Sequence, residues 1–185
     1  MSEGLRSGRV LNRLAALFIG LPASDARAAL KDLRFSNQQI AWIGHLVEAW
    51  ELLGARMERA LMASGPLAAA EVRAWAAGAG RTQARSLFRI ACAVWAGKRE
   101  AGEATVPATR VVPAYRALVR SAYRDPIALG DLAVDGEDLL AAGFARGPTL
   151  GKILRALLAR VVDDPSLNTR ETLLRMAREI AGEEE

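Results

Sequence analysis

The sequence contains very few of the residues that build catalytic or metal centres. Its 185 residues include one cysteine, Cys92, and one histidine, His45. A single cysteine excludes an internal disulfide framework, and a single histidine leaves too few ligands for a Cys/His zinc site. This scarcity argues against a self-sufficient metalloenzyme, a Cys–His or Ser–His hydrolase and a secreted disulfide-rich scaffold.

Long apolar runs and strand patterns are also missing. No uncharged apolar run reaches the roughly 20 residues that a membrane-spanning helix needs. The polar segment Met1–Arg9 does not have the form of a signal peptide, which contains an apolar core and a small-residue cleavage site. Alternation of β-branched and polar residues, which is typical of strands, is not found. We therefore expect a cytoplasmic protein with no membrane segment and no β-sheet.

Apolar residues recur instead at helical spacing along the chain. Ser36 and Gln39 form a capping box that opens one helix. Pro113, at the end of the loop-like stretch Gly102–Pro113, and Pro148 both suit the first turn of a helix, where a missing N–H costs nothing. The expected helices cover roughly residues 9–19, 24–33, 57–63, 67–77, 82–98, 114–124 and 148–162, with others after Ser36, before Gly143 and from Asn168–Glu171.

These patterns predict an all-α fold, a bundle of about eight to ten short helices with no sheet. The length allows one compact domain or two small ones. We expect a helical body domain over residues 1–125 and a helical-hairpin tail domain over residues 126–185. No fixed period of 20–50 residues recurs, which argues against a solenoid.

Positive charge gathers in the middle of the chain. Residues 1–80 carry 9 basic and 7 acidic side chains, residues 81–124 carry 9 and 2, and residues 125–185 carry 7 and 12. Clustered cations attract a polyanion such as a nucleic acid. The alternative is a compositional bias toward arginine and alanine that has no binding role.

Two arginine rows within this basic segment have a spacing of four residues. That spacing places side chains along one helix face, where like charges repel by a few tenths of a kcal/mol per pair and a polyanion would reverse the effect. Tyr115 and Tyr123 flank the second row and could stack on a base or ribose. The alternative is a solvated helix face with half-buried tyrosines. The rows are Arg81, Arg85 and Arg89, and Arg116, Arg120 and Arg124.

A second candidate site is the helical turn that leads into the helix from Pro148. A helix N-terminus offers unpaired N–H groups and about half a positive charge, which suits a phosphate. Glycines leave the backbone approachable, a threonine hydroxyl can donate, and two cations flank the turn. The alternative is a tight hairpin in which Gly151 only permits close helix packing. The candidate residues are Arg146, Gly147, Thr149, Gly151 and Lys152.

For the other candidate site residues, the sequence favours a structural role. His45 lies beside the apolar side of its helix, and Cys92 lies among core residues. The acidic pairs Asp163–Asp164 and Glu137–Asp138 fall at helix ends, where carboxylates commonly cap or complement the dipole. No glycine-rich loop follows a strand, so a P-loop or Rossmann unit is absent.

The spacing of the tail residues follows a specific pattern. Residues 136–139 read G-E-D-L, residues 143–151 read G-F-A-R-G-P-T-L-G, and residues 168–174 read N-T-R-E-T-L-L, with a leucine-rich helix between the last two. Leu33–Ile40 reads LRFSNQQI. Together these segments resemble the C-terminal body and tail of bacterial class II CCA-adding tRNA nucleotidyltransferases, within the tRNA nucleotidyltransferase and poly(A) polymerase family. Arg146 stands where that family often has a proline.

The resemblance implies an RNA-binding module that grips the backbone of the tRNA acceptor and T-arm for 3′-end maturation. The family's catalytic head carries a D-x-D metal pair on a sheet, and no D-x-D occurs in this chain. Its nucleotide-selecting template and His-Asp centre are missing too. We therefore expect no catalytic site and no cofactor here, with Mg²⁺ needed only by a separate or upstream catalytic head. The alternative is a helical protein-interaction module with no RNA affinity.

Overall fold

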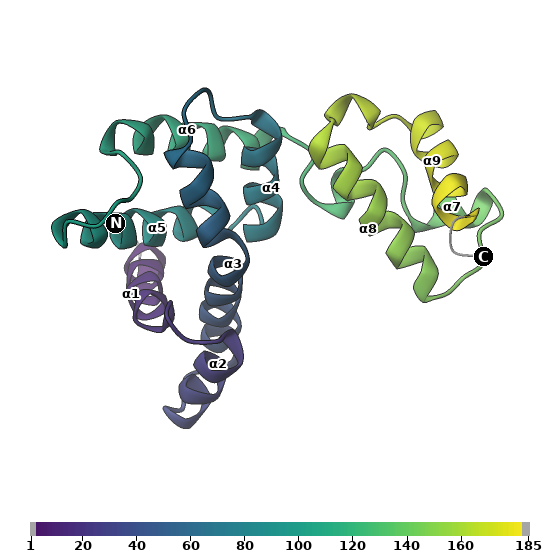
Figure 1. Cartoon of the computed structure of the whole chain (residues 1–185). Helices are drawn as coiled ribbons and strands as arrows, with labels where there is room; N and C mark the ends of the chain where they lie inside the picture. The colour runs from purple at the N-terminus through teal and green to yellow at the C-terminus, as the bar shows by residue number, and fades with distance from the viewer. Residues whose placement is uncertain (1–2, 183–185) are drawn as a thin grey trace.

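The computed structural model describes residues 3–182, which form helices joined by short loops (Figure 1). This range contains nine α-helices, two short 3₁₀ turns and no strand, which confirms the predicted all-α fold. None of the described helices is both long enough and apolar enough to span a bilayer. The α-helices are α1 (Glu3–Phe18), α2 (Ala23–Asp32), α3 (Asn37–Met62), α4 (Ala69–Ala79), α5 (Ala84–Glu100), α6 (Ala108–Arg124), α7 (Gly136–Ala141), α8 (Pro148–Asp163) and α9 (Arg170–Gly182), and the 3₁₀ turns are η1 (Leu129–Asp131) and η2 (Pro165–Leu167).

Helix α3 is one continuous helix of 26 residues, where the sequence predicted separate pieces. Its predicted start is confirmed, because the Ser36 N–H donates to Gln39 Oε1 at 3.0 Å and the Gln39 N–H donates to Ser36 Oγ at 3.3 Å. Gly54 does not interrupt the helix. A Cβ at Gly54 would lie 2.8 Å from the Trp50 ring, so this glycine makes room for an indole.

Helix α6 begins at Ala108, and Pro113 lies inside it. The predicted loop up to Pro113, with Pro113 in the first helical turn, is therefore wrong. An interior proline removes one helical hydrogen bond. Contacts elsewhere in the fold hold this turn, since Arg110 donates to Ala63 O at 2.6 Å and to Gly65 O at 2.8 Å.

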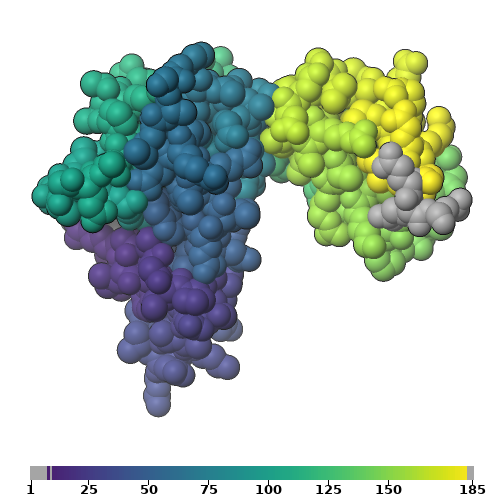
Figure 2. Space-filling view, viewed as in Figure 1, coloured from purple at the N-terminus to yellow at the C-terminus, as the bar shows by residue number. Residues whose placement is uncertain are grey.

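Two separate hydrophobic clusters lie beneath the helices. One spans α1–α6 and Ile127 and includes the fully buried rings of Phe88 and Trp95, which meet edge to face with centroids 5.7 Å apart. The other joins the connector between α6 and α7 (residues 125–135) to α7–α9 around Leu139 and Leu157. Figure 2 shows the corresponding two lobes with a narrow junction. The proposed domain boundary at residues 125 and 126 stays a prediction.

Two arginines join the lobes at that junction. Arg73 of α4 donates to the carbonyls of Val162 at 2.5 Å and Asp163 at 2.6 Å, in the last turn of α8. Arg81 forms an ion pair with Asp131 of η1 at 2.6 Å. Both contacts fix where the C-terminal lobe lies against α4.

In the C-terminal lobe, one predicted helix start is confirmed and another is revised. Pro148 is the first residue of α8, as predicted. Asn168 was expected to open the last helix. Instead, its side chain accepts from the Ala133 N–H at 2.8 Å and donates to Asp131 O at 2.9 Å, which holds the connector. The hydroxyl of Thr169 accepts from the Thr172 N–H and caps α9.

Candidate nucleic-acid interface

The outer side of α6 carries three exposed arginines, Arg116, Arg120 and Arg124. They follow one another at four-residue intervals along this helix, so they form one ridge, which we call the α6 ridge. The ion pairs among the described residues include none of the three. Their charges are therefore available to a ligand.

Arg85 of α5 joins the ridge around an open hollow of about 570 Å³ between α5 and α6, which we call the arginine hollow. The Arg85 guanidinium carbon lies 5.0 Å from the centroid of the Tyr123 ring, a distance typical of a cation–π contact. Tyr123 is 55% exposed. The hollow is lined by Arg85, Tyr115, Arg116, Val119, Arg120, Tyr123 and Arg124.

The two tyrosines have different environments. Tyr115 is half-buried, and its ring packs against Phe88 with centroids 5.7 Å apart. It anchors α6 to the core while it also lines the arginine hollow. Tyr123 is the more exposed of the two tyrosines and offers a base the larger surface.

The first arginine row does not stay together. Arg81 precedes α5, which begins at Ala84, and its ion pair with Asp131 ties it to the connector. Asp131 also accepts the N–H groups of Ile127 and Ala128, each at 2.9 Å. The prediction that Arg81 lies in a helical row with Arg85 and Arg89 is therefore wrong, because the helix starts three residues later.

Arg89 lies on α5 but faces a different helix. It is exposed and borders a small cavity of about 230 Å³ that also involves Asn12 and Arg13 of α1. Arg85 therefore lines the arginine hollow with the α6 ridge, whereas Arg81 meets only the end of the ridge, in a separate hollow that it lines with Arg124 and Asp131.

The second candidate site lies at the start of α8. Thr149 and Lys152 are exposed there, and so is Arg146, which stands 3.8 Å from Glu137 in a solvent-exposed ion pair of the kind that contributes little to stability. A Cβ at Gly147 would meet no atom within 4 Å. At Gly151 it would meet only the end of Arg155 at 3.5 Å, an ordinary contact. The alternative that Gly151 serves close helix packing is therefore wrong.

The structure does not bring the two candidate sites together. The last turn of α8 lies against Arg73 of α4, whereas Arg146 and Gly147 lie at its other end (Figure 1). With 16 residues, α8 is about 24 Å long. A ligand that contacts both sites must be extended on that scale.

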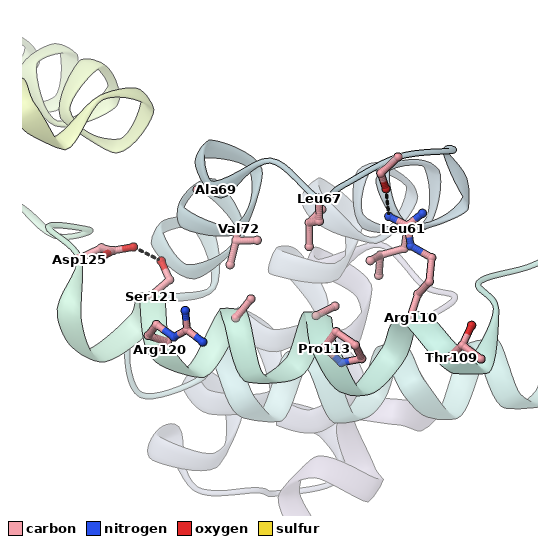
Figure 3. A pocket seen from close by; sticks show the side chains of 13 residues that line it. Leu61, Leu67, Ala69, Val72, Thr109, Arg110, Pro113, Arg120, Ser121 and Asp125 are labelled. Atoms are coloured by element: carbon pink, nitrogen blue, oxygen red, sulfur yellow. Dashed lines mark hydrogen bonds between the residues drawn. The ribbon is translucent and has the colours of Figure 1, made fainter.

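A groove on the neighbouring face of α6 was not found from the sequence. It has a volume of about 470 Å³ and lies between α6, α4 and the loop after α3 (Figure 3). The signal was the small and apolar series Pro113, Ala114 and Ala117 on α6, but its significance depends on α4 packing alongside. Arg120 borders both this groove and the arginine hollow.

The described residues contain no group of three or more His, Cys, Asp and Glu side chains that could hold a metal ion. His45 has the predicted structural role, since its Nε2 lies 3.0 Å from Ala79 O. Burial raises the pKa of the Cys92 thiol, which makes its reactive thiolate scarcer.

Comparison with known proteins agrees with the pattern of the tail. Residues 100–177 match the family described as tRNA nucleotidyltransferase domain 2, putative. This range contains the α6 ridge and the start of α8. The match thus covers α6 and most of the C-terminal lobe, and it spans less than half of the chain.

Two curated relatives are similar to a part of the chain. The chain is 43% identical over 51 residues to the CCA-adding enzyme of Limosilactobacillus fermentum, and 48% identical over 48 residues to that of Latilactobacillus sakei. These matches cover 28% and 26% of this chain, but 13% and 12% of the relatives. No solved structure matches the chain significantly. Over these segments the chain is similar to CCA-adding enzymes, which confirms the predicted resemblance.

Proposed function

We propose that the chain is a tRNA-binding module of a CCA-adding tRNA nucleotidyltransferase-related protein. It grips the backbone of the acceptor and T-arm for 3′-end maturation and has no catalytic site of its own. Mg²⁺ chemistry then belongs to a catalytic head on another chain or elsewhere in a longer protein. The observation that carries the proposal is the arginine hollow, where two helices present four exposed arginines outside the ion pairs of residues 3–182.

Phosphate binding gives these arginines a favourable partner. Stacked like charges on α6 repel one another, and RNA phosphates would convert this repulsion into attraction. Arginine suits phosphate because its planar guanidinium forms two parallel hydrogen bonds to one anion. Arg85 is held beside Tyr123, so part of its conformational freedom is already lost before binding.

The start of α8 supplies the second contact in this proposal. Its exposed N–H groups, Thr149, Arg146 and Lys152 would bind a phosphate of another RNA segment. The length of α8 separates the two contacts by more than a single nucleotide can span. A folded RNA with a long continuous helix, such as tRNA, meets this geometry.

The test replaces the α6 ridge by alanine (Arg116→Ala, Arg120→Ala and Arg124→Ala together) and measures tRNA binding as a function of salt. Loss of three phosphate contacts should lower the magnitude of the slope of log K against log salt by about 2–3. The matched control removes three positive charges elsewhere (Lys31→Ala, Arg34→Ala and Arg178→Ala). The control should keep the wild-type slope.

Two results would contradict the proposal. Equal salt slopes in the ridge variant and the wild type would assign the ridge to a solvated face. Salt-insensitive capture of a protein partner, with no tRNA binding by the wild type, would favour the protein-interaction module. In a parallel assay, the purified chain should add no nucleotides to tRNA that lacks its 3′ end when CTP, ATP and Mg²⁺ are present.

A further inference from the structure

The groove between α4 and α6 has the size and lining of a ligand site. Its volume of about 470 Å³ lies within the range of about 300–1,000 Å³ that small-molecule sites occupy. Figure 3 shows Leu67 and Val72 on one side of it and Pro113 of α6 on the other. Ala114 and Ala117 complete a floor without charge.

Hydrogen bonds hold the walls of this groove in place. Arg110 of α6 donates to Ala63 O and Gly65 O, which keeps the loop between α3 and α4 against the start of α6. At the other end, the buried Ser121 hydroxyl donates to Asp125 at 2.8 Å. The groove is therefore already formed without a ligand, so binding requires little ordering of its walls.

Arg120 connects the groove to the proposed RNA-binding surface. Its side chain borders the groove and also belongs to the arginine hollow on the adjoining face of α6. A phosphate bound at Arg120 would bring its own nucleoside to the mouth of the groove. The base could then leave water for an apolar floor, provided that it is not paired in a duplex.

We propose that the α4–α6 groove holds an unpaired nucleobase of the bound RNA while Arg120 binds the adjoining phosphate. This rests on the proposed function and names the part of the RNA that the module recognises. Charge favours this occupant over a second copy of the chain, because a symmetric dimer across α6 would bring two arginine ridges together. An apolar peptide would leave Arg120 without an anion.

The experiment compares two RNA hairpins with the same stem, one blunt and one with a short single-stranded 3′ extension. Ala117→Phe fills the groove and leaves every charge in place, and Ala159→Phe on the exposed side of α8 is the matched control. Wild type and control should bind the extended hairpin about tenfold more tightly than the blunt one, the gain expected when one unpaired base is bound. Ala117→Phe should lose this preference and keep the affinity for the blunt hairpin.

A second measurement needs no variant. With 4-thiouridine in the extension, photocrosslinks should include peptides from residues 61–72, which line the groove and not the arginine hollow. Crosslinks confined to α5 and α6 would overturn the proposal, as would a preference for the extended hairpin that survives Ala117→Phe. A dimer in sedimentation that Ala117→Phe abolishes would assign the groove to a second copy and overturn it too.

The failure of this proposal differs from the failure of the proposed function. If the proposed function is wrong, the wild type binds neither hairpin in a salt-dependent way. If only the groove proposal is wrong, both hairpins bind through the α6 ridge and the extension adds nothing.

Discussion

Arg73 offers the sharpest test of how the two lobes are held. Its guanidinium donates to Val162 O and Asp163 O, two carbonyls that have no helical partner at the end of α8. A hydrogen bond that involves a charged group contributes about 1.5–3 kcal/mol. The hydrogen bond to Asp163 O is exposed, so we use the low end of this range for each bond. We therefore expect Arg73→Ala to lower the free energy of unfolding by about 2–3 kcal/mol in total.

This loss should be visible in both stability and shape. For a chain of this length, 1 kcal/mol shifts the melting temperature by about 2–4 °C, so Arg73→Ala should lower it by about 4–12 °C. If the lobes unfold separately, the shift belongs to the transition that includes α8. Small-angle scattering should show a larger radius of gyration, because α8 is released from α4.

The lysine variant provides the control for the Arg73 prediction. Arg73→Lys keeps the charge but places a single ammonium where two nitrogen atoms reach two carbonyls, so it should recover about half of the lost stability. Unchanged melting and scattering in Arg73→Ala would refute the reasoning, since the lobes would then be held by something other than this contact.

Two further predictions concern Gly151 and Glu58. Gly151→Ala should stabilise α8 by up to about 1 kcal/mol, because alanine favours a helix and its Cβ would meet only the end of Arg155. Thermal melting measures this change. A destabilised variant would show that Gly151 is needed for close packing after all. Burial opposes ionisation of Glu58, but hydrogen bonds from Lys98 and Thr105 outweigh it and lower its pKa. This stabilisation is complete above the ordinary glutamate pKa of about 4.3 and is lost as the pH falls through the lower folded-state value. In urea unfolding at pH 7, Glu58→Gln should therefore be about 1–2 kcal/mol less stable than the wild type. This difference between variant and wild type should shrink in acid. A difference that does not change with pH would exclude the ionisation of Glu58 as its cause.

The parts of the fold that depend on neighbouring residues could be predicted from the sequence. The capping box at Ser36 and the first helical position of Pro148 are both determined within four residues, and both are confirmed. The all-α fold follows from the same local periodicity. The resemblance in the tail also rested on short spacings, and it is confirmed by the family match over residues 100–177.

The parts that depend on distant residues could not be predicted. Arg110 holds the early start of α6 through carbonyls about 45 residues before it. Arg81 is paired with Asp131, 50 residues away, so its spacing to Arg85 was misleading. The groove beside Pro113 exists only because α4 packs along α6, a contact that leaves no periodic signal in either segment.

The ion pairs help to distinguish an arginine-rich binding surface from a mere bias of the composition toward arginine. Compositional bias by itself gives no reason for unpaired arginines to converge from separate helices. In the N-terminal segment, Arg27 is paired with Glu48 and Arg56 with Glu71, and Arg73 binds backbone carbonyls. Acidic residues of the C-terminal segment also have partners within the chain. Asp131 forms an ion pair with Arg81, Asp138 forms one with Arg170, and Asp164 accepts a hydrogen bond from Ser166. The three arginines of the α6 ridge stay outside all these pairs and converge with Arg85 on one hollow, as expected of a surface that binds an anion from outside the chain.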